Sequence, residues 1–162
     1  MAVGSASWSF TEDDFAAITK ALQRFLDDAN ARCALLVDRS GQLVATVGEQ
    51  PRFDSTAFAT LTAADFSAND QLAKLIGERD FNSLFHQGEK ESMYLADVAR
   101  RLILVVLFDS RTTLGLVRLK MKQTVEELTR LFEQVFNRPP QDQGGAPGLL
   151  AGADDEIDKL FQ

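Results

Sequence analysis

The residue types that carry out chemistry in enzymes are sparse in this sequence and stand apart from one another. There is a single cysteine, Cys33, and a single histidine, His86, and neither has the partners of a nucleophilic triad. One histidine supplies one metal ligand where zinc needs three or four, and one cysteine can form neither an internal disulfide nor a thiolate cage. Cys33 opens an apolar run, which indicates a small buried residue, and His86 is interpreted as a structural or interface residue.

The carboxylates and glycines also lack the spacing of a catalytic site. The acidic clusters at residues 12–14 and 154–156 stand at predicted helix starts, where the helix dipole explains them without a metal. The sequence contains neither the G-x-x-x-x-G-K-[ST] motif that binds nucleotide phosphates nor the G-x-S-x-G nucleophile elbow. We therefore expect no catalytic residue, no metal and no cofactor, and a protein that is not an enzyme with its own active site.

Composition and charge narrow the class of protein. The 162 residues, 45% hydrophobic and 25% charged, are typical of one compact domain with an ordinary core and a tail. A net charge of -7 disfavours nucleic acid and anionic membranes as partners, and no run of Lys or Arg exceeds two residues. The N-terminus lacks the pattern of a secretory signal, and the longest apolar run, residues 102–108, is too short to span a bilayer. These features favour a cytoplasmic protein without membrane insertion.

The periodicity of apolar residues predicts eight elements in the order α-β-β-α-β-β-β-α. Apolar residues recur at helical spacing in three segments, 11–30, 54–77 and 113–136. β-prone runs predict strands at 33–38, 42–47, 81–87, 93–98 and 102–108. Gly41 lies in the turn of the first hairpin, and the last strand is apolar on both faces, as in a central strand. The order indicates an α+β fold with a five-stranded, mostly antiparallel sheet and three helices.

The character of the sequence changes after residue 136. Prolines and glycines predict a linker over residues 137–153. Residues 154–162 then begin with acids and carry Ile157, Leu160 and Phe161 at spacings of three and one. This short amphipathic segment suits docking into a groove of a partner, and a disordered solubilising end is the alternative. The predicted division is a domain at 1–136, a linker and a docking segment.

Several stretches carry a resemblance to a known family. They are LLVDRSGQLVATVG (35–48), TLTA (60–63), QLAKLIGE (71–78), FHQGEKES (85–92), FDSRTTLGLVRLK (108–120) and DDEIDKLF (154–161). Together they resemble the roadblock family, and within it the MglB group, which regulates the bacterial Ras-like GTPase MglA. The fourth, fifth and sixth stretches are the most specific, and their order argues against chance.

The resemblance implies a function and a set of surfaces. It implies a roadblock fold and a homodimer that is paired through the second helix and third strand. The homodimer would activate a Ras-like small GTPase in bacterial cell polarity or gliding motility. It would be located in the cytoplasm and concentrated at a cell pole. Two copies would bind one MglA-like GTPase and speed GTP hydrolysis by remodelling its switch regions, without an arginine finger. The implied GTPase-binding platform consists of Thr60, Ala64, Ser67, Ala68, Gln71 and Lys74. The implied dimer interface consists of Leu61, Ala68, Leu72, Leu84, Phe85 and His86. Docking of the tail on the GTPase would use Ile157, Leu160 and Phe161.

The residues of the second helix support the platform and also allow a simpler interpretation. Thr60, Ala64, Ser67, Gln71 and Lys74 share one helical stripe whose short side chains let a partner approach closely. The same small residues could instead seat the helix on its own sheet. Four residues depart from the family pattern and, if they lie on or beside the platform, can shift GTPase affinity; they are Asp65, Phe66, Asn69 and Asp70.

Two other functions remain open from the sequence. One is a roadblock adaptor that recruits a GTPase or a polarity protein without stimulating hydrolysis. The other is a small-ligand sensor of profilin-like or PAS-like topology, which a pocket lined by glycines or aromatic residues would favour; the sequence shows no such cluster. Arg79, Arg100, Arg101 and Arg111 are expected to be solvated, and none is assigned a catalytic role.

Overall fold

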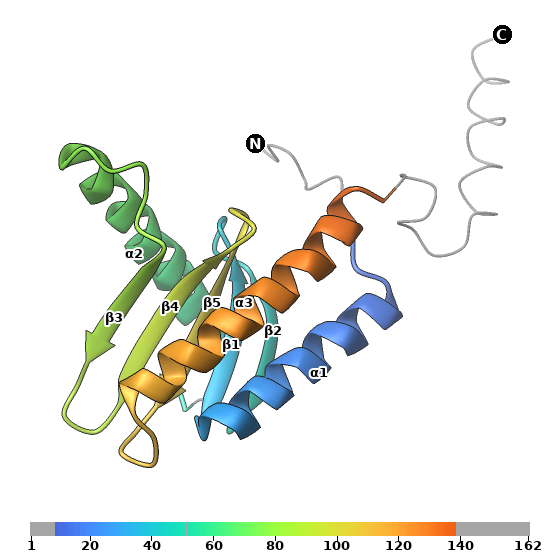
Figure 1. The fold of residues 1–162 in the computed structure, drawn as a ribbon, viewed down its shortest axis with the longest axis horizontal. Coiled ribbons are helices and arrows are strands. Elements are labelled where there is room, and N and C mark those ends of the chain that lie inside the picture. Colours follow the sequence, from blue (N-terminus) through green and yellow to red (C-terminus); the bar gives the residue numbers. More distant parts are fainter. Residues whose placement is uncertain (1–8, 51, 139–162) are drawn as a thin grey trace, which may run out of the picture.

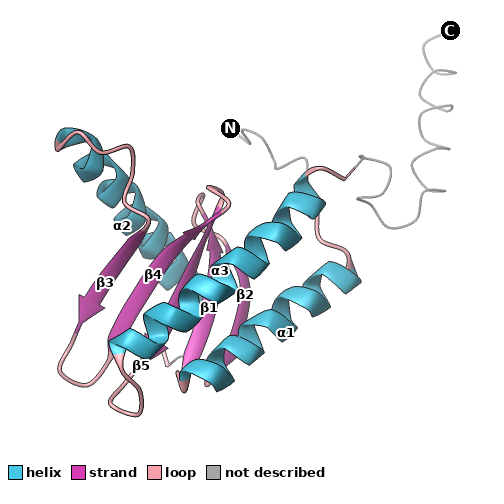
Figure 2. Cartoon of the chain, viewed as in Figure 1, coloured by secondary structure: helices cyan, strands magenta, loops and turns pink. Residues whose placement is uncertain are grey.

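The structure, a computed structural model, describes residues 9–50 and 52–138 of the 162. Its elements follow the predicted order, with a five-stranded sheet and three helices in this part of the chain (Figures 1 and 2). The predicted docking segment, and all of the predicted linker except Asn137 and Arg138, lie outside the described residues.

The helices begin where the sequence supplies capping groups. The helix α1, Glu12–Ala29, starts with a capping box in which Thr11 accepts from the Asp14 amide and Asp14 accepts from the Thr11 amide. Helix α3, Leu114–Phe136, is capped by Thr113, which accepts from the Leu116 amide. Among the described helices, none is both long enough and apolar enough to cross a membrane.

The sheet is antiparallel at every pairing, in the order β2-β1-β5-β4-β3. Its strands are β1 (Cys33–Asp38), β2 (Leu43–Gly48), β3 (Ser83–Gln87), β4 (Ser92–Val98) and β5 (Leu102–Phe108). The central place of β5 confirms the prediction made from its apolar run, because both of its faces are covered. Strand β3 pairs only with β4, so its outer edge is free among the described residues.

The sheet separates two hydrophobic cores. Figure 1 shows α1 and α3 side by side on one face of the sheet, and α2 (Ser55–Leu75) on the opposite face. On the α1/α3 face, large fully buried side chains such as Phe25, Phe132 and Leu104 form the main core. On the α2 face the core is smaller and gathers around Phe66, which packs against residues that include Leu35 and Val105. Alternate residues of β1 and β5 enter the two cores.

The β1–β2 turn approaches α2 closely. Gly41 has a φ of +97°, which favours glycine, and a Cβ at this position would stand 3.2 Å from the Cα of Thr60. The glycine that the hairpin required on sequence grounds therefore also lets the turn touch the first half of α2.

Candidate interaction surface

Helix α2 presents one buried side and a wide exposed side. Asp54 caps the helix by accepting from the amides of Thr56 and Ala57. The side toward the sheet is lined mainly by small residues around one large one, and these buried residues are Ala59, Thr62, Ala63, Phe66, Asn69 and Ala73. Small side chains do seat this helix on its own sheet, as the simpler interpretation required, but they are not the residues of the predicted platform.

The six predicted platform residues are all exposed on α2. Thr60, Ser67 and Lys74 recur at intervals of seven, so they follow one line along the helix, with Ala64 and Gln71 between them. Except for Lys74 and Gln71, these side chains reach only a short way from the backbone. The stripe is therefore a low, mildly polar surface that a flat partner can approach.

A second, apolar stripe runs beside the first. Leu61, Leu72 and Leu75 are 69%, 58% and 82% exposed, and Ala68 lies between the first two at helical spacing. Ile76, at the C-cap of α2, is 69% exposed as well. Scattered single apolar residues are ordinary on a protein surface, whereas a continuous row along one helix marks a contact site.

One polar contact places the apolar stripe on the side of α2 that faces the free edge of β3. Asp65 follows Leu61 by four residues and precedes Leu72 by seven, so it belongs to the same side of the helix. Its Oδ2 lies 2.7 Å from Nε2 of His86 on β3. Leu84, two residues before His86 on the same face of β3, is half-buried against the α2-side core. Phe85 points to the opposite face, where its ring stacks on Phe108 with centroids 6.2 Å apart.

The structure brings most of the predicted dimer residues together on one side of the molecule. Leu61, Ala68 and Leu72 are on α2, and Leu84 and His86 are on the adjacent edge strand. Phe85 differs from them, because it packs against the core on the α1/α3 face of the sheet. In the described chain His86 has one polar partner, a carboxylate, consistent with a structural or interface residue.

Three of the four residues that depart from the family pattern do not lie on the platform. Phe66 is fully buried under α2, and Asn69 is 6% exposed. Asp70 turns toward the β1–β2 turn, where Arg39 donates to it at 2.7 Å. Asp65 lies at the β3 side and is held by His86. The expectation that this group stands on or beside the platform is therefore wrong for Phe66 and Asn69, because helical spacing turns them inward.

Arg39 fastens α2 to the end of the sheet. Its guanidinium donates to Asp70 of α2 and to Asp97 of β4, and it lies over the Phe66 ring at 5.0 Å from the centroid. Burial opposes the charged guanidinium, but the hydrogen bonds to Asp97 and Asp70 outweigh it and raise the pKa of Arg39. The charge cluster of Arg39, Asp70 and Asp97 therefore helps to orient α2 and both of its stripes. It lies on the opposite side of the helix from the apolar stripe.

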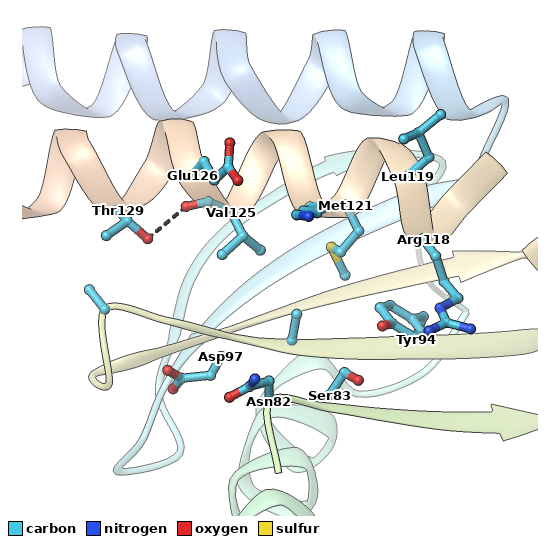
Figure 3. Close-up of a pocket in the computed structure, with 13 residues that line it drawn as sticks. Asn82, Ser83, Tyr94, Asp97, Arg118, Leu119, Met121, Val125, Glu126 and Thr129 are labelled. Carbon is cyan, nitrogen blue, oxygen red and sulfur yellow. Dashed lines mark hydrogen bonds between the residues drawn. The ribbon is translucent and has the colours of Figure 1, made fainter. Parts of the chain in front are cut away.

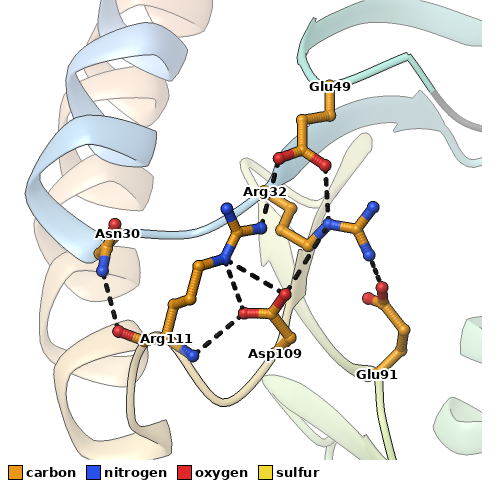
Figure 4. A network of polar contacts seen from close by, with 6 residues as sticks. All are labelled: Asn30, Arg32, Glu49, Glu91, Asp109 and Arg111. Atoms are coloured by element: carbon orange, nitrogen blue, oxygen red, sulfur yellow. Dashed lines mark hydrogen bonds and ion pairs between the residues drawn. The ribbon is translucent and has the colours of Figure 1, made fainter.

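A second charge network joins residues next to the ends of β1, β2, β4 and β5 (Figure 4). Arg32 pairs with Glu91 in the β3–β4 turn and donates to Glu49 at 2.8 Å, while Arg111 donates to Asp109 at 3.0 Å and to Glu49 at 3.2 Å. The hydrogen bonds from Arg32 and then Arg111 lower the pKa of Glu49, and that from Arg111 lowers the pKa of Asp109. Two of the most specific stretches of the sequence, 85–92 and 108–120, thus meet in space.

The same network determines whether the Arg111 side chain is free to contact a partner protein. Arg111 is held by two carboxylates, and its backbone carbonyl accepts from the Asn30 side chain at 2.8 Å. Arg101 is likewise engaged, with its guanidinium 4.2 Å from the centroid of the Phe136 ring. Both side chains are bound to their own molecule rather than projecting freely.

The described residues hold few of the groups that catalysis needs. No three His, Cys, Asp or Glu side chains gather there as a metal would require. Cys33 is 3% exposed, and burial raises the pKa of its thiol, so it is a buried small residue as predicted. A hollow of about 660 Å³ opens between α3 and the β3–β4 strands (Figure 3), yet it has Tyr94 as its single aromatic residue and no glycine. This lining is not the one that a small-ligand sensor would favour, whereas a second hollow of about 540 Å³ at the β3–β4 turn does include Phe85, Phe108 and Gly88.

The architecture matches a known domain. Residues 17–108, from within α1 to the end of β5, match the model of the roadblock/LC7 domain. The chain belongs to the roadblock/LC7 family.

Several solved roadblock structures are similar to this chain in both sequence and fold. MglB of Myxococcus xanthus is 47% identical, with a TM-score of 0.72, over 74% of this chain and 98% of that one. The gliding protein MglB of Thermus thermophilus is 33% identical, with a TM-score of 0.73, over 79% of this chain and 97% of that one. A structure described as MglB with a tetrameric arrangement is 32% identical, with a TM-score of 0.74, over 80% and 97%. The resemblance to the MglB group is confirmed at the level of sequence and fold.

Two features of this roadblock surface were missing from the predicted site. Leu75 and Ile76 extend the apolar stripe to the C-terminal end of α2. The intervals of seven, four and three residues from Leu61 through Ala68 and Leu72 to Leu75 were a signal that could have found this extension. The anchoring of α2 by Arg39 left no local signal, because its partners Asp70 and Asp97 lie 31 and 58 positions away.

Proposed function

We propose that this roadblock protein is a homodimeric GTPase-activating protein for an MglA-like Ras-like GTPase. The observation that carries the proposal is the pair of exposed stripes on α2, one apolar and one mildly polar, beside the free edge of β3. The likeness to MglB proteins supports the choice of partner.

The apolar stripe and the β3 edge together form the proposed dimer interface. Leu61, Leu72 and Leu75 are too exposed in the single chain to contribute to its core. Burying such side chains against a second copy gains roughly 2 kcal/mol each before the cost of ordering. Joining two β3 strands would also remove an unpaired edge, which is otherwise a site of aggregation. A twofold dimer satisfies both needs with one surface.

The polar stripe is the proposed platform for the GTPase. In a dimer built on the apolar stripes, the adjacent polar stripes of both copies would lie near the twofold axis. Ser67 and Gln71, at the middle of α2, would then be at the centre of one shared surface. One GTPase across two chains follows from this arrangement, as the resemblance implies.

Stimulation of hydrolysis is proposed to proceed without an arginine finger. Arg111 and Arg101 are engaged within their own chain. Arg79 and Arg100 are exposed but lie in loops outside both stripes. The GTPase's own residues would therefore supply the chemistry, and this chain would reposition them. Residues 154–162, through Ile157, Leu160 and Phe161, are proposed to bind the GTPase away from its nucleotide.

Single-turnover GTP hydrolysis by the MglA-like GTPase, with and without this chain, tests the proposal. We expect an acceleration of about tenfold or more. Alanine at Arg79, Arg100, Arg101 or Arg111, one at a time, should leave most of it, whereas loss of a true finger costs roughly 10³ to 10⁵ in rate. Binding with no acceleration would replace the activator with the adaptor that only recruits its GTPase.

A further inference from the structure

On the opposite side of the sheet from α2, the hollow between α3 and the β3–β4 strands has the form of a docking groove. We call it the α3–β3 groove, and its volume is about 660 Å³. Met121 and Val125 of α3 and Tyr94 of β4 supply its apolar surface, as Figure 3 shows, and Leu119, 53% exposed, stands at its rim. It lies beside the contact between α3 and β4, where Asn82 and Ser83 at the start of β3 complete its lining.

The groove carries an uneven set of charges. At one end are Arg118 and Lys122, both exposed, and neither forms an ion pair or hydrogen bond with another residue in the described ranges. Toward the other end lies Glu126, also exposed and unpaired within the described residues. The remaining acid of the lining, Asp97, is already neutralised by Arg39. Two free positive charges therefore precede one free negative charge along α3.

The C-terminal segment of this same chain has the complementary order. Residues 154–156 are Asp, Asp and Glu, and after Ile157 come Asp158 and then Lys159, the one basic residue of 154–161. Ile157, Leu160 and Phe161 provide apolar side chains among these charges. When the segment runs in the same direction as α3, its acids meet Arg118 and Lys122 and its lysine meets Glu126. The reverse direction would set like charges against each other, so the match selects one orientation.

The chain is long enough for this contact to form within one molecule. From Phe136, the end of α3, back to Arg118 is about 27 Å at ~1.5 Å per residue. The 15 residues from 139 to 153 reach about 50 Å when extended. Residue 154 can thus arrive at the Arg118 end of the groove before the segment turns back along α3.

From the groove, its charges and this length, we propose that residues 154–161 dock into the α3–β3 groove of their own chain. The groove lies across the sheet from both α2 stripes, so docking there leaves α2 uncovered. A consequence that rests on the proposed function is that a segment held in the groove is withdrawn from the GTPase. Residues 154–161 would then have two alternative positions, one in the groove of their own chain and one on the GTPase.

Disulfide trapping in the full-length chain tests the proposal without any GTPase, so its failure would leave the proposed function standing. Ile157→Cys is combined with Leu119→Cys at the groove or, as control, with Phe15→Cys on α1. Phe15 is 46% exposed and lies near the end of α3, where Arg138 donates to Asp14 at 2.8 Å. Chain length therefore favours the control pair. Cys33 is buried and can stay, with mass mapping of each bond.

We expect the groove pair to form its intramolecular disulfide about tenfold faster than the control pair, because docking raises the effective concentration of one thiol at the other. Reversing both groove charges, Arg118→Glu with Lys122→Glu, should remove most of that advantage. The matched reversal of two exposed charges elsewhere, Lys20→Glu with Arg130→Glu, should not, and circular dichroism checks that both variants fold. Equal rates for the two cysteine pairs, a bond that joins two chains only, or equal loss in both charge variants would overturn the proposal.

Discussion

The two faces of the sheet are covered in opposite ways. On one face, α1 and α3 pack against each other and bury aromatic and aliphatic side chains such as Phe25, Leu128 and Phe132. On the other face, α2 lies alone, seats mostly small residues on the sheet and turns Leu61 and Leu72 outward. The same residue type is thus used for the core of the monomer on one side and displayed on the other. The difference shows that the α1/α3 face holds the larger core, and it supports the proposal that the α2 face serves association.

The same substitution on the two faces gives the largest contrast in stability. Leu128→Ala, at a fully buried position of α3, should lower the free energy of unfolding by about 3 kcal/mol, because it leaves a cavity. Leu61→Ala, at a position 69% exposed, should cost less than about 0.5 kcal/mol in the monomer. Urea unfolding at two protein concentrations separates this cost from any change in dimerisation. A loss as large for Leu61→Ala in dilute protein would mean that α2 belongs to the core of the fold.

A charge on the apolar stripe should affect association rather than folding. Light scattering of the unaltered chain should give twice the 17.9 kDa mass of one copy. Leu72→Glu should weaken self-association about a hundredfold, because each copy would bury an unpaired carboxylate. Phe15→Glu, on the exposed side of α1, is the control and should keep the dimer. A monomer at tens of micromolar for the unaltered chain would remove the proposed interface and the platform built on it.

The two arginine contacts that tie helices to their surroundings should differ in strength. Arg39→Gln removes the partner of both Asp70 and Asp97 and should cost about 2 kcal/mol, since those carboxylates are then left close together and partly buried. Arg24→Gln breaks one exposed pair with Glu127 and should cost less than about 0.5 kcal/mol. Chemical denaturation of both variants measures the difference. Similar losses would show that Arg39 does not anchor α2.

The smallest effect is expected in acid, on the α1/α3 side. The side-chain hydrogen bond from Arg138 is the main cause that lowers the pKa of Asp14 from 3.8 to about 2. A carboxyl with a lowered pKa stabilises the fold above its unfolded pKa, and this stability is lost as the pH falls from about 4 to 2. The full shift corresponds to roughly 2 kcal/mol, and solvent screening at the helix end reduces it to about 1 kcal/mol. Arg138→Gln should flatten the pH dependence of stability over that interval; an unchanged slope would contradict the assignment.

Elements with strong local signals could be predicted from the sequence, and contacts across the fold could not. The helices at 11–30 and 113–136 were correct to within a residue or two, because caps at Thr11 and Thr113 mark their starts. The third strand begins at Ser83 rather than at residue 81, and Asn82, a residue typical of turns, lies directly before it. Helical spacing placed the platform residues on one stripe but left open whether that stripe faced a partner or the sheet, and the structure shows it exposed. The link from Asp65 to His86 joins residues 21 positions apart and has no signature in the sequence.

Binding of the MglA-like GTPase to matched arginine variants on the two faces tests the central claim most directly. Ser67→Arg with Gln71→Arg puts two long charged side chains on the polar stripe of α2, and Gln123→Arg with Gln134→Arg puts two on exposed positions of α3. Calorimetric titration should show the GTPase binding about a hundredfold more weakly to the α2 variant and within about twofold of the unaltered chain for the α3 variant, with circular dichroism unchanged in both. Undiminished binding to the α2 variant, or loss of binding to the α3 variant, would contradict the assignment of the α2 face to the GTPase.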